Sequence, residues 1–299
     1  MKFDMTYCEL CPRRCHANRT KHPGFCGGTN QIRAAKAMLH FWEEPCISGK
    51  NGSGAVFFSG CALKCCFCQN QEIAAGNFGM ELTTERLSDI FLELQEQGAH
   101  NINLVTASHV LPWVVTALEK SKPKLRIPIV WNTGGYELVN SLHVLDGLID
   151  IYLPDFKFFD TETARLFANA PDYPEIAETA LEEMLRQTGR PVFDSDLLKK
   201  GCIVRHLILP GHRHEAIALL HHLQEVFGSD KFLLSLMAQY TPVSNTIFPE
   251  LGRRVTKMEY QSVLKIAQEL NFSGYSQENS SAVREYTPDF NLQGLKHYS

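Results

Sequence analysis

Short apolar runs alternate with helical patterns along most of this chain, and the alternation limits the folds that are open to it. Six runs have the length and composition of buried strands: Ala55–Phe58, Ile102–Val105, Ile127–Val130, Ile149–Leu153, Ile203–Leu209 and Phe232–Met237. Strands that alternate with helices are typical of α/β proteins with a parallel sheet. The periodicity by itself does not distinguish a barrel from an open sheet.

Helical patterns fall between these runs and after them. Apolar residues at helical spacing predict helices over residues 87–94, 111–119, 173–187 and 216–227. Gly98 and Gly228 are plausible stops for the first and last of these. Beyond the last run, Thr256 and Glu259 have the spacing of a capping box and predict one more helix. The tail after Gly274 is polar, and we expect it to be mobile or packed on the surface.

The chain therefore divides into three parts. Residues 1–50 are rich in cysteine, proline and glycine and read as a small loop-rich segment. Residues 51–240 carry the strand–helix alternation, and residues 241–299 form a helical C-terminal extension with its tail. With 299 residues, 44% of them hydrophobic, the chain can bury a sizeable core.

Charge and hydropathy exclude several classes of partner. The net charge is -4, and no basic stripe is present, so we expect no nucleic-acid partner. No apolar stretch is long enough to cross a bilayer, and the N-terminus lacks the apolar core of a signal peptide, so we expect no membrane association. We expect a cytoplasmic protein, where ten cysteines indicate metal binding or catalysis rather than disulfides.

The loop after the first predicted strand, residues 61–68, contains the residues that point most clearly to a reaction. Cys61, Cys65 and Cys68 stand at a Cys-x3-Cys-x2-Cys spacing, with Phe67 just before the third cysteine. Three thiolates this close together can hold three irons of a four-iron cluster and leave the fourth iron open to a ligand. A structural zinc site usually takes four ligands from two Cys-x2-Cys knuckles, and this loop has no second knuckle, whereas a disulfide needs an oxidising compartment. We read Cys66, outside this spacing, as a spare thiol that faces the protein.

The loop resembles the signature of the radical S-adenosylmethionine (SAM) superfamily, Cys-x3-Cys-x-aromatic-Cys. The resemblance extends over residues 57–70, 101–106, 149–157 and 204–211. Together these segments are similar to the branch related to pyruvate formate-lyase activating proteins, in particular its members with a cysteine-rich N-terminus. The resemblance implies a partial (β/α)6 parallel barrel with the cluster loop after its first strand.

The resemblance also implies the cofactors and the reaction. A [4Fe-4S] cluster on Cys61, Cys65 and Cys68 would bind SAM at its open iron and reduce it by one electron, which yields a 5′-deoxyadenosyl radical. Phe67 would lie beside the adenine. The radical would take a hydrogen from a glycine of a partner protein, such as a glycyl radical enzyme, or from a small molecule. A flavodoxin or ferredoxin would supply the electron.

Other cofactor contacts are expected where parallel strands end, because sites of parallel β/α folds lie there. We expect Thr106, Ser108, Asn132, Thr133, Asp155 and His206 to contact the cofactor. Residues 106–109 replace the Gly-Gly-Glu segment that holds the substrate amine in the superfamily. His109 faces either the substrate or a structural hydrogen-bond partner. Asp155 and Lys157 form an ion pair or face the substrate, and either Arg205 or His206 points inward.

Four further cysteines, Cys8, Cys11, Cys15 and Cys26, lie in the N-terminal segment. This segment has too few apolar residues to fold alone, and a metal would organise it. Four thiolates suit zinc or a second iron–sulfur cluster, and unligated thiols are the alternative. For the chain as a whole, the alternative to a radical SAM enzyme is a non-catalytic iron–sulfur or metal protein that carries electrons or acts as a scaffold.

Overall fold

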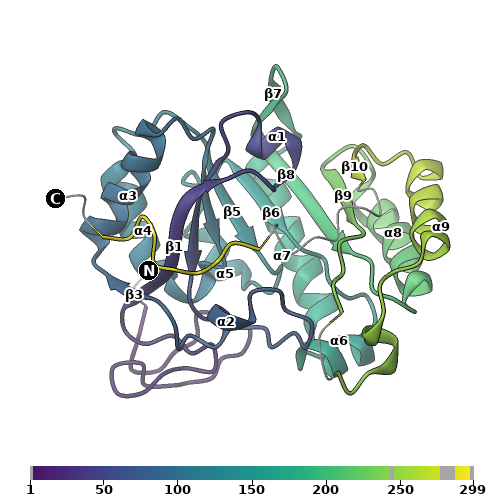
Figure 1. Ribbon diagram of the computed structural model, residues 1–299, viewed down its shortest axis with the longest axis horizontal. Coiled ribbons are helices and arrows are strands. Elements are labelled where there is room, and N and C mark those ends of the chain that lie inside the picture. Colours follow the sequence, from purple (N-terminus) through teal and green to yellow (C-terminus); the bar gives the residue numbers. More distant parts are fainter. Residues whose placement is uncertain (1–2, 243–245, 277–286, 297–299) are drawn as a thin grey trace.

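The computed structural model describes residues 3–242, 246–276 and 287–296, and in them the chain forms one α/β body (Figure 1). The described strands join in a single sheet with the order β10-β9-β8-β6-β5-β4-β2-β1-β3, and β7 (Val192–Asp194) pairs with β8 only. The larger helices cover one face of this sheet, from α3 and α4 on the left of Figure 1 to α8 and α9 on the right.

The six predicted strands are all present, and each pairs in parallel with its neighbours among the six. They are β2 (Ser53–Phe58), β4 (Ile102–Val105), β5 (Ile129–Thr133), β6 (Ile151–Pro154), β8 (Leu197–Leu207) and β9 (Leu233–Met237). A short strand, β10 (Gly274–Ser276), adds a further parallel pairing to β9. The predicted α/β class with a parallel sheet is confirmed, and in the described residues the two ends of the sheet do not pair.

The predicted N-terminal segment, residues 1–50, contributes a strand to the sheet. Residues Ile32–His40 form β1, which pairs antiparallel with β2 and with β3 (Met80–Leu82). Lys36 obscured this strand in the sequence because a charge breaks its apolar pattern. Its stem is buried, and its ammonium group reaches the carbonyl of Asp289 at 2.8 Å.

The helices agree with the predicted patterns. They are α3 (Thr84–Glu96), α4 (Leu111–Ser121), α7 (Tyr173–Thr188), α8 (Arg213–Phe227) and α9 (Lys257–Glu269). The Thr83 side chain caps α3, and Thr256 and Glu259 form the predicted capping box of α9. The sequence did not reveal four shorter helices, namely α1 (Pro45–Ser48), α2 (Gln71–Ala74), α5 (Val139–His143) and α6 (Thr161–Ala168). Single 3₁₀ turns lie at Ser108–Val110 and Pro249–Gly252.

The segment that contains α1 covers the face of the sheet opposite the main helices. Ile47 packs there in one apolar cluster with Val130 and Ile151. Their strand neighbours Trp131 and Tyr152 belong to the core on the helix side, because successive residues of a strand face opposite ways. The loop before α1 therefore runs along the concave side of the sheet, next to the site described below.

The described end of the chain packs on β1. The amide of Leu292 donates to the carbonyl of Ala35, and Phe290 and Leu295 are buried. The expected polar tail is thus packed on the surface over residues 287–296, and residues 277–286 and 297–299 lie outside the described part. In the described residues, no helix is long and apolar enough to span a membrane.

Candidate functional site

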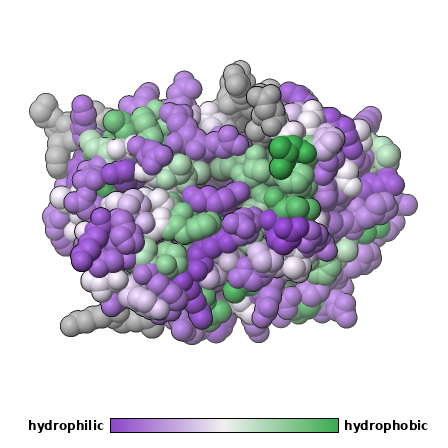
Figure 2. Space-filling view, turned by 90° about the horizontal axis from the view of Figure 1, so that it is seen from below, coloured by the Kyte–Doolittle hydropathy of each residue, from purple (hydrophilic) through white to green (hydrophobic). Residues whose placement is uncertain are grey.

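A cavity opens at the carboxyl ends of the parallel strands, where α/β folds place their ligands. The loops that follow β2, β4, β5 and β6 line it, together with residues of β8, the β1–α1 loop and the C-terminal segment. The α2 and α6 helices and the N-terminal loops lie along the lower edge of Figure 1. Figure 2 looks at this edge, where apolar patches alternate with polar residues.

The three signature thiols share this cavity. Cys61, Cys65 and Cys68 all line it, whereas Cys66 does not. Cys66 packs against the core, and its amide donates to the carbonyl of Phe167. The three cysteines of the spacing thus share the cavity, and Cys66 lies outside it.

Burial keeps these thiols protonated when no metal is bound. It raises the pKa of Cys61 to about 11, and the neighbouring Cys68 adds to this effect. The pKa values of Cys65 and Cys68 are also raised by burial, and the Lys157 ammonium opposes the shift at both. A bound metal would hold the same groups as thiolates, and Lys157 then offsets part of their negative charge.

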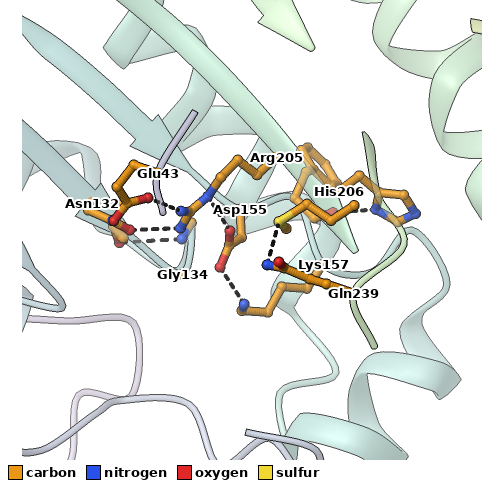
Figure 3. A network of polar contacts seen from close by, with 12 residues as sticks. Glu43, Asn132, Gly134, Asp155, Lys157, Arg205, His206 and Gln239 are labelled. Atoms are coloured by element: carbon orange, nitrogen blue, oxygen red, sulfur yellow. Dashed lines mark hydrogen bonds and ion pairs between the residues drawn. The ribbon is translucent and has the colours of Figure 1, made fainter. Parts of the chain in front are cut away.

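A network of ion pairs and hydrogen bonds forms one wall of the cavity (Figure 3). Nε of Arg205 donates to Asp155 at 2.9 Å, Nη1 to Glu43 at 3.2 Å and Nη2 to the side-chain oxygen of Asn132 at 2.7 Å. The other carboxylate oxygen of Asp155 accepts from Lys157, so Asp155 bridges the two cations. Asp155 and Lys157 therefore form the ion pair and both line the cavity, and their contact with a substrate stays a prediction.

The network keeps Asp155 and Lys157 charged although the fold largely excludes them from water. Burial acts to raise the pKa of Asp155, but Arg205 and Lys157 outweigh it and keep that pKa below the usual range. The pKa of Lys157 is raised, because Asp155 outweighs the effect of burial. Glu43 differs, since burial raises its pKa more than Arg205 lowers it.

Thr106 has an unusual backbone conformation at the cavity. Its φ is +60°, a region that β-branched residues rarely adopt. Its amide donates to the carbonyl of Asn132 at 2.8 Å, which holds the turn after β4 against β5. Such local strain is found at functional sites. Thr106, Asn132 and Thr133 all line the cavity where they were expected.

The glycine pair after β5 has a structural reason. Gly135 has a φ of +79°, and a Cβ there would lie 2.2 Å from the carbonyl oxygen of Asp155. Gly134 lines the cavity, and a Cβ there would lie 3.0 Å from Leu63 of the cluster loop. The pair thus lets the loops after β2, β5 and β6 approach each other closely.

Phe67 lines the cavity and is also part of the core. Its ring meets Phe158, Phe167 and Tyr240 edge-on, with centroids 6.0, 6.5 and 6.2 Å away. The ring is thereby fixed before any ligand binds. Its position beside an adenine remains a prediction.

Two residues expected to contact the cofactor, Ser108 and His206, do not line the cavity. Ser108 donates its hydroxyl to the buried Glu137, which also accepts from Thr133. His206 turns to the opposite side of β8 from Arg205, where its Nδ1 lies 2.7 Å from the carbonyl of Phe156 (Figure 3). The pleat of β8 allows only one of the two neighbours to face the cavity, and that residue is Arg205.

His109 has the structural role that was left open for it. It is buried, and its Nε2 lies 2.7 Å from the carbonyl oxygen of Ser59. The backbone carbonyl of His109 accepts a hydrogen bond from Arg19 of the N-terminal segment.

Several lining residues were not expected at the site. Glu43, His40 and Trp42 come from the end of β1 and the loop before α1, and Thr287 and Pro288 come from the C-terminal segment. No motif or strand-end pattern in the sequence places these residues at the site. The glutamate pair at 43–44, beside a proline in a loop-rich segment, was the one available signal, since buried carboxylates need a partner.

The N-terminal cysteines lie beside the cluster loop. Cys8, Cys11 and Cys26 are buried, and Cys15 is half-buried. Among the residues that the structure describes, no group of three or more His, Cys, Asp or Glu side chains is positioned to hold a metal ion. The metal expected at these four cysteines therefore remains a prediction.

The donor set at the cavity fits the cofactors that the resemblance implies. Three thiols from one loop open onto a cavity that also holds two buried cations and a fixed aromatic ring. Three thiolates can hold a [4Fe-4S] cluster with one iron free, and the charged wall can meet the amine and carboxylate of an amino-acid ligand.

Two solved structures are similar to this chain over about three quarters of its length. SuiB of Streptococcus suis, solved with SAM bound, is 13% identical over 73% of this chain and 48% of its own, with a TM-score of 0.47. A radical SAM methyltransferase from Sphaerobacter thermophilus is 13% identical over 75% of this chain and 66% of its own, with a TM-score of 0.48. The chain spans about half the length of SuiB.

A curated relative and a family model cover more of the sequence. An uncharacterized protein of Methanocaldococcus jannaschii is 27% identical over 274 residues, which is 88% of this chain and 75% of the relative. The model of the radical SAM superfamily matches residues 55–223, more than half of the 299 residues. This match contains the cluster loop and the network around Asp155 and Arg205, and it shows that the chain belongs to the radical SAM superfamily.

Proposed function

We propose that this protein is an iron–sulfur enzyme that cleaves SAM reductively and uses the radical to take a hydrogen from a glycine of a partner protein. The observation that carries the first half is the shared cavity, into which Cys61, Cys65 and Cys68 open opposite the Arg205 network. When bound there, the reduced cluster and SAM would supply a 5′-deoxyadenosyl radical.

Each part of the cavity has a distinct task in this proposal. The three cysteines hold the cluster, and Lys157 offsets their charge. Arg205 is held by three acceptors and keeps Asp155 ionised at a fixed position, so the carboxylate can orient a ligand amine or hydroxyl without rearranging. Phe67 and Leu63 exclude water from the apolar side of the cavity.

The test of SAM cleavage is release of 5′-deoxyadenosine by the anaerobically reconstituted, dithionite-reduced protein. We expect product from the wild type and none from Cys65→Ala. A reducible cluster that yields no product, with or without candidate partners, would instead favour the electron-carrier or scaffold function, because a carrier cycles electrons without consuming SAM.

The protein partner rests on the similarity to pyruvate formate-lyase activating proteins and on one surface feature. Phe41 and Trp42 are 50% and 56% exposed, and Trp42 lies at the cavity itself. Exposed aromatic residues beside a site are typical of protein-binding surfaces. A small-molecule substrate is the alternative, and it needs no such surface.

The partner is tested with a glycyl radical enzyme from the same organism and detection of a glycine-centred radical by electron paramagnetic resonance. Phe41→Ala should reduce radical transfer to the partner and leave 5′-deoxyadenosine release without partner unchanged. Phe193→Ala, which removes a 44% exposed ring on β7, is the matched control. Equal transfer by both variants would argue against this surface.

The electron is proposed to come from a flavodoxin or ferredoxin in the cytoplasm, because the reaction consumes one electron for each SAM cleaved. Reduced flavodoxin or ferredoxin in place of dithionite should sustain product formation. Failure of both proteins with an enzyme that is active under dithionite would contradict this proposal.

A further inference from the structure

A buried cation in the N-terminal segment has no counter-ion. The Arg19 side chain is 2% exposed. Its guanidinium donates to the carbonyls of Thr29 at 2.6 Å and His109 at 2.7 Å, and its Nη1 lies 3.8 Å from the sulfur of Cys8. Within the described residues, no carboxylate pairs with it. A buried charge without an opposite charge is strongly unfavourable, and buried arginines are therefore normally paired.

The groups that could carry the missing negative charge are cysteines. Besides Cys8, the sulfur of Cys26 lies near the Arg19 guanidinium. A Cβ on Gly28 would lie between them, 2.7 Å from Nη2 of Arg19 and 3.2 Å from that sulfur. A Cβ on Gly24 would likewise stand 3.4 Å from the sulfur of Cys15 and 3.7 Å from that of Cys26. Because Gly24 and Gly28 have no side chains, the sulfur atoms can lie close to one another and to the guanidinium of Arg19.

Backbone hydrogen bonds gather the cysteines. Across one turn, the Cys8 amide donates to the carbonyl of Ala17, and the His16 amide donates to the carbonyl of Cys8. The Arg14 amide donates to Cys11 within the same turn. Cys8, Cys11 and Cys15 therefore stand on one tight loop, and Cys26 approaches it from the next.

We propose that Cys8, Cys11, Cys15 and Cys26 bind a second metal centre as thiolates, and that Arg19 is its buried counter-charge. A thiol is neutral, whereas each metal-bound sulfur is a thiolate, so a metal centre of this kind supplies the negative charge that Arg19 lacks. Zinc and an iron–sulfur cluster share this ligand chemistry. The site is separate from the SAM cavity and goes beyond the proposed function. The metal itself must draw the sulfurs to bonding distance, as metals do in small loop-rich segments.

The proposed centre is anchored directly to the cluster loop. The carbonyl of Cys26 accepts from the amide of Cys61 at 3.0 Å. On the other side, Arg13 donates to the carbonyls of Ala62 at 2.9 Å and Ala168 at 3.0 Å. The ring of Phe25 lies 4.5 Å from the Arg13 guanidinium. Binding of the metal would thus hold the cluster loop from two directions.

The experiment measures iron, sulfide and zinc in the full-length protein after anaerobic reconstitution with either metal. The variant Cys61→Ala/Cys65→Ala/Cys68→Ala should still hold about one zinc or one iron–sulfur cluster per chain. Cys8→Ser/Cys26→Ser should lose that centre and keep the other. Cys46→Ala/Cys202→Ala, which removes two buried thiols elsewhere, should keep both. Zinc or iron in the first variant supports the proposal, and absence of both overturns it.

A second measurement covers the case in which the double serine variant fails to fold. Arg19→Met should let a chelator remove the metal held by the triple alanine variant about tenfold faster, because the compensating charge is gone. Arg33→Met, which removes a surface arginine paired with Glu81, should leave that rate unchanged. Equal removal rates in the two methionine variants would overturn the role of Arg19. Metal content and chelation do not depend on SAM cleavage, so failure of the proposed function would leave these results unaffected.

Discussion

The backbone amide of Cys61 donates to the carbonyl of Cys26 over 3.0 Å, so the first cysteine of the cluster loop is held by the last of the four cysteines Cys8, Cys11, Cys15 and Cys26. The next residue, Gly27, also packs closely against the loop region that follows, because a Cβ on Gly27 would lie 2.1 Å from the carbonyl oxygen of Ala75. The N-terminal segment is therefore one wall of the cluster loop rather than an appendage.

This packing makes Gly60 sensitive to substitution. Its φ is +109°, and a Cβ there would lie 2.8 Å from the carbonyl oxygen of Cys26. We expect Gly60→Ala to lower the free energy of unfolding by about 1–3 kcal/mol from strain, with a further loss from the clash. Urea unfolding of the variant and the wild type measures this loss of stability. Gly98→Ala is the control, because it shares a positive φ of +90° but meets only one atom, 4.0 Å away. Equal losses would show that the contact with Cys26 contributes nothing.

Removal of Arg205 should be severe because two carboxylates depend on it. Arg205→Met leaves Asp155 and Glu43 buried without their shared cation, and we expect a loss of roughly 3–5 kcal/mol. Adding Asp155→Asn should recover part of that loss, since it removes one uncompensated charge. Denaturant unfolding of the single and double variants measures the coupling. Strictly additive losses would contradict the network.

The cysteines of the cluster loop should differ in iron binding. Cys65→Ala removes a ligand and should abolish the stable four-iron cluster, whereas Cys66→Ala should leave iron content and 5′-deoxyadenosine release near the wild-type values. Iron and sulfide analysis after anaerobic reconstitution checks both in one series. A Cys66→Ala protein with an intact cluster but no activity would show that Cys66 acts in the reaction.

His109 should destabilise the protein in acid. Burial, with help from Arg19, lowers its pKa to about 4, and in the described part of the chain its Nδ1 has no hydrogen-bond partner. The unfolded chain takes up a proton below about pH 6.5 and the folded chain only near pH 4, so stability falls as the pH drops through this window. The contribution is roughly 3 kcal/mol. His109→Gln should flatten the unfolding free energy between pH 7 and pH 4 by about that amount, and parallel curves would refute this origin.

The C-terminal segment should affect ligand binding through one aromatic contact. Phe290 meets Phe57 edge-on with centroids 5.6 Å apart, and Phe57 lines the cavity. We expect Phe290→Ala to cost about 3 kcal/mol of stability and to weaken SAM binding, because Phe57 loses its support. Calorimetric titration with SAM measures the affinity. Unchanged affinity in a destabilised variant would show that the segment serves the fold alone.

The sequence by itself determined the features that depend on near neighbours in the chain. Apolar periodicity located the six parallel strands, and the spacing of Thr256 and Glu259 identified the capping box of α9. The spacing of Cys61, Cys65 and Cys68 identified the cluster loop, because a loop of eight residues brings these thiols together whatever the rest of the chain does.

Only the tertiary structure decided which distant side chains meet. Arg205 reaches Glu43 across 162 positions of sequence and Asn132 across 73, so no local pattern could pair them. The choice of Arg205 over His206 depended on how β8 sits between β6 and β9. Strand β1 escaped prediction because its charged residues find partners far along the chain. Local propensity acts over a few residues, whereas buried charges are satisfied by whatever the fold places beside them.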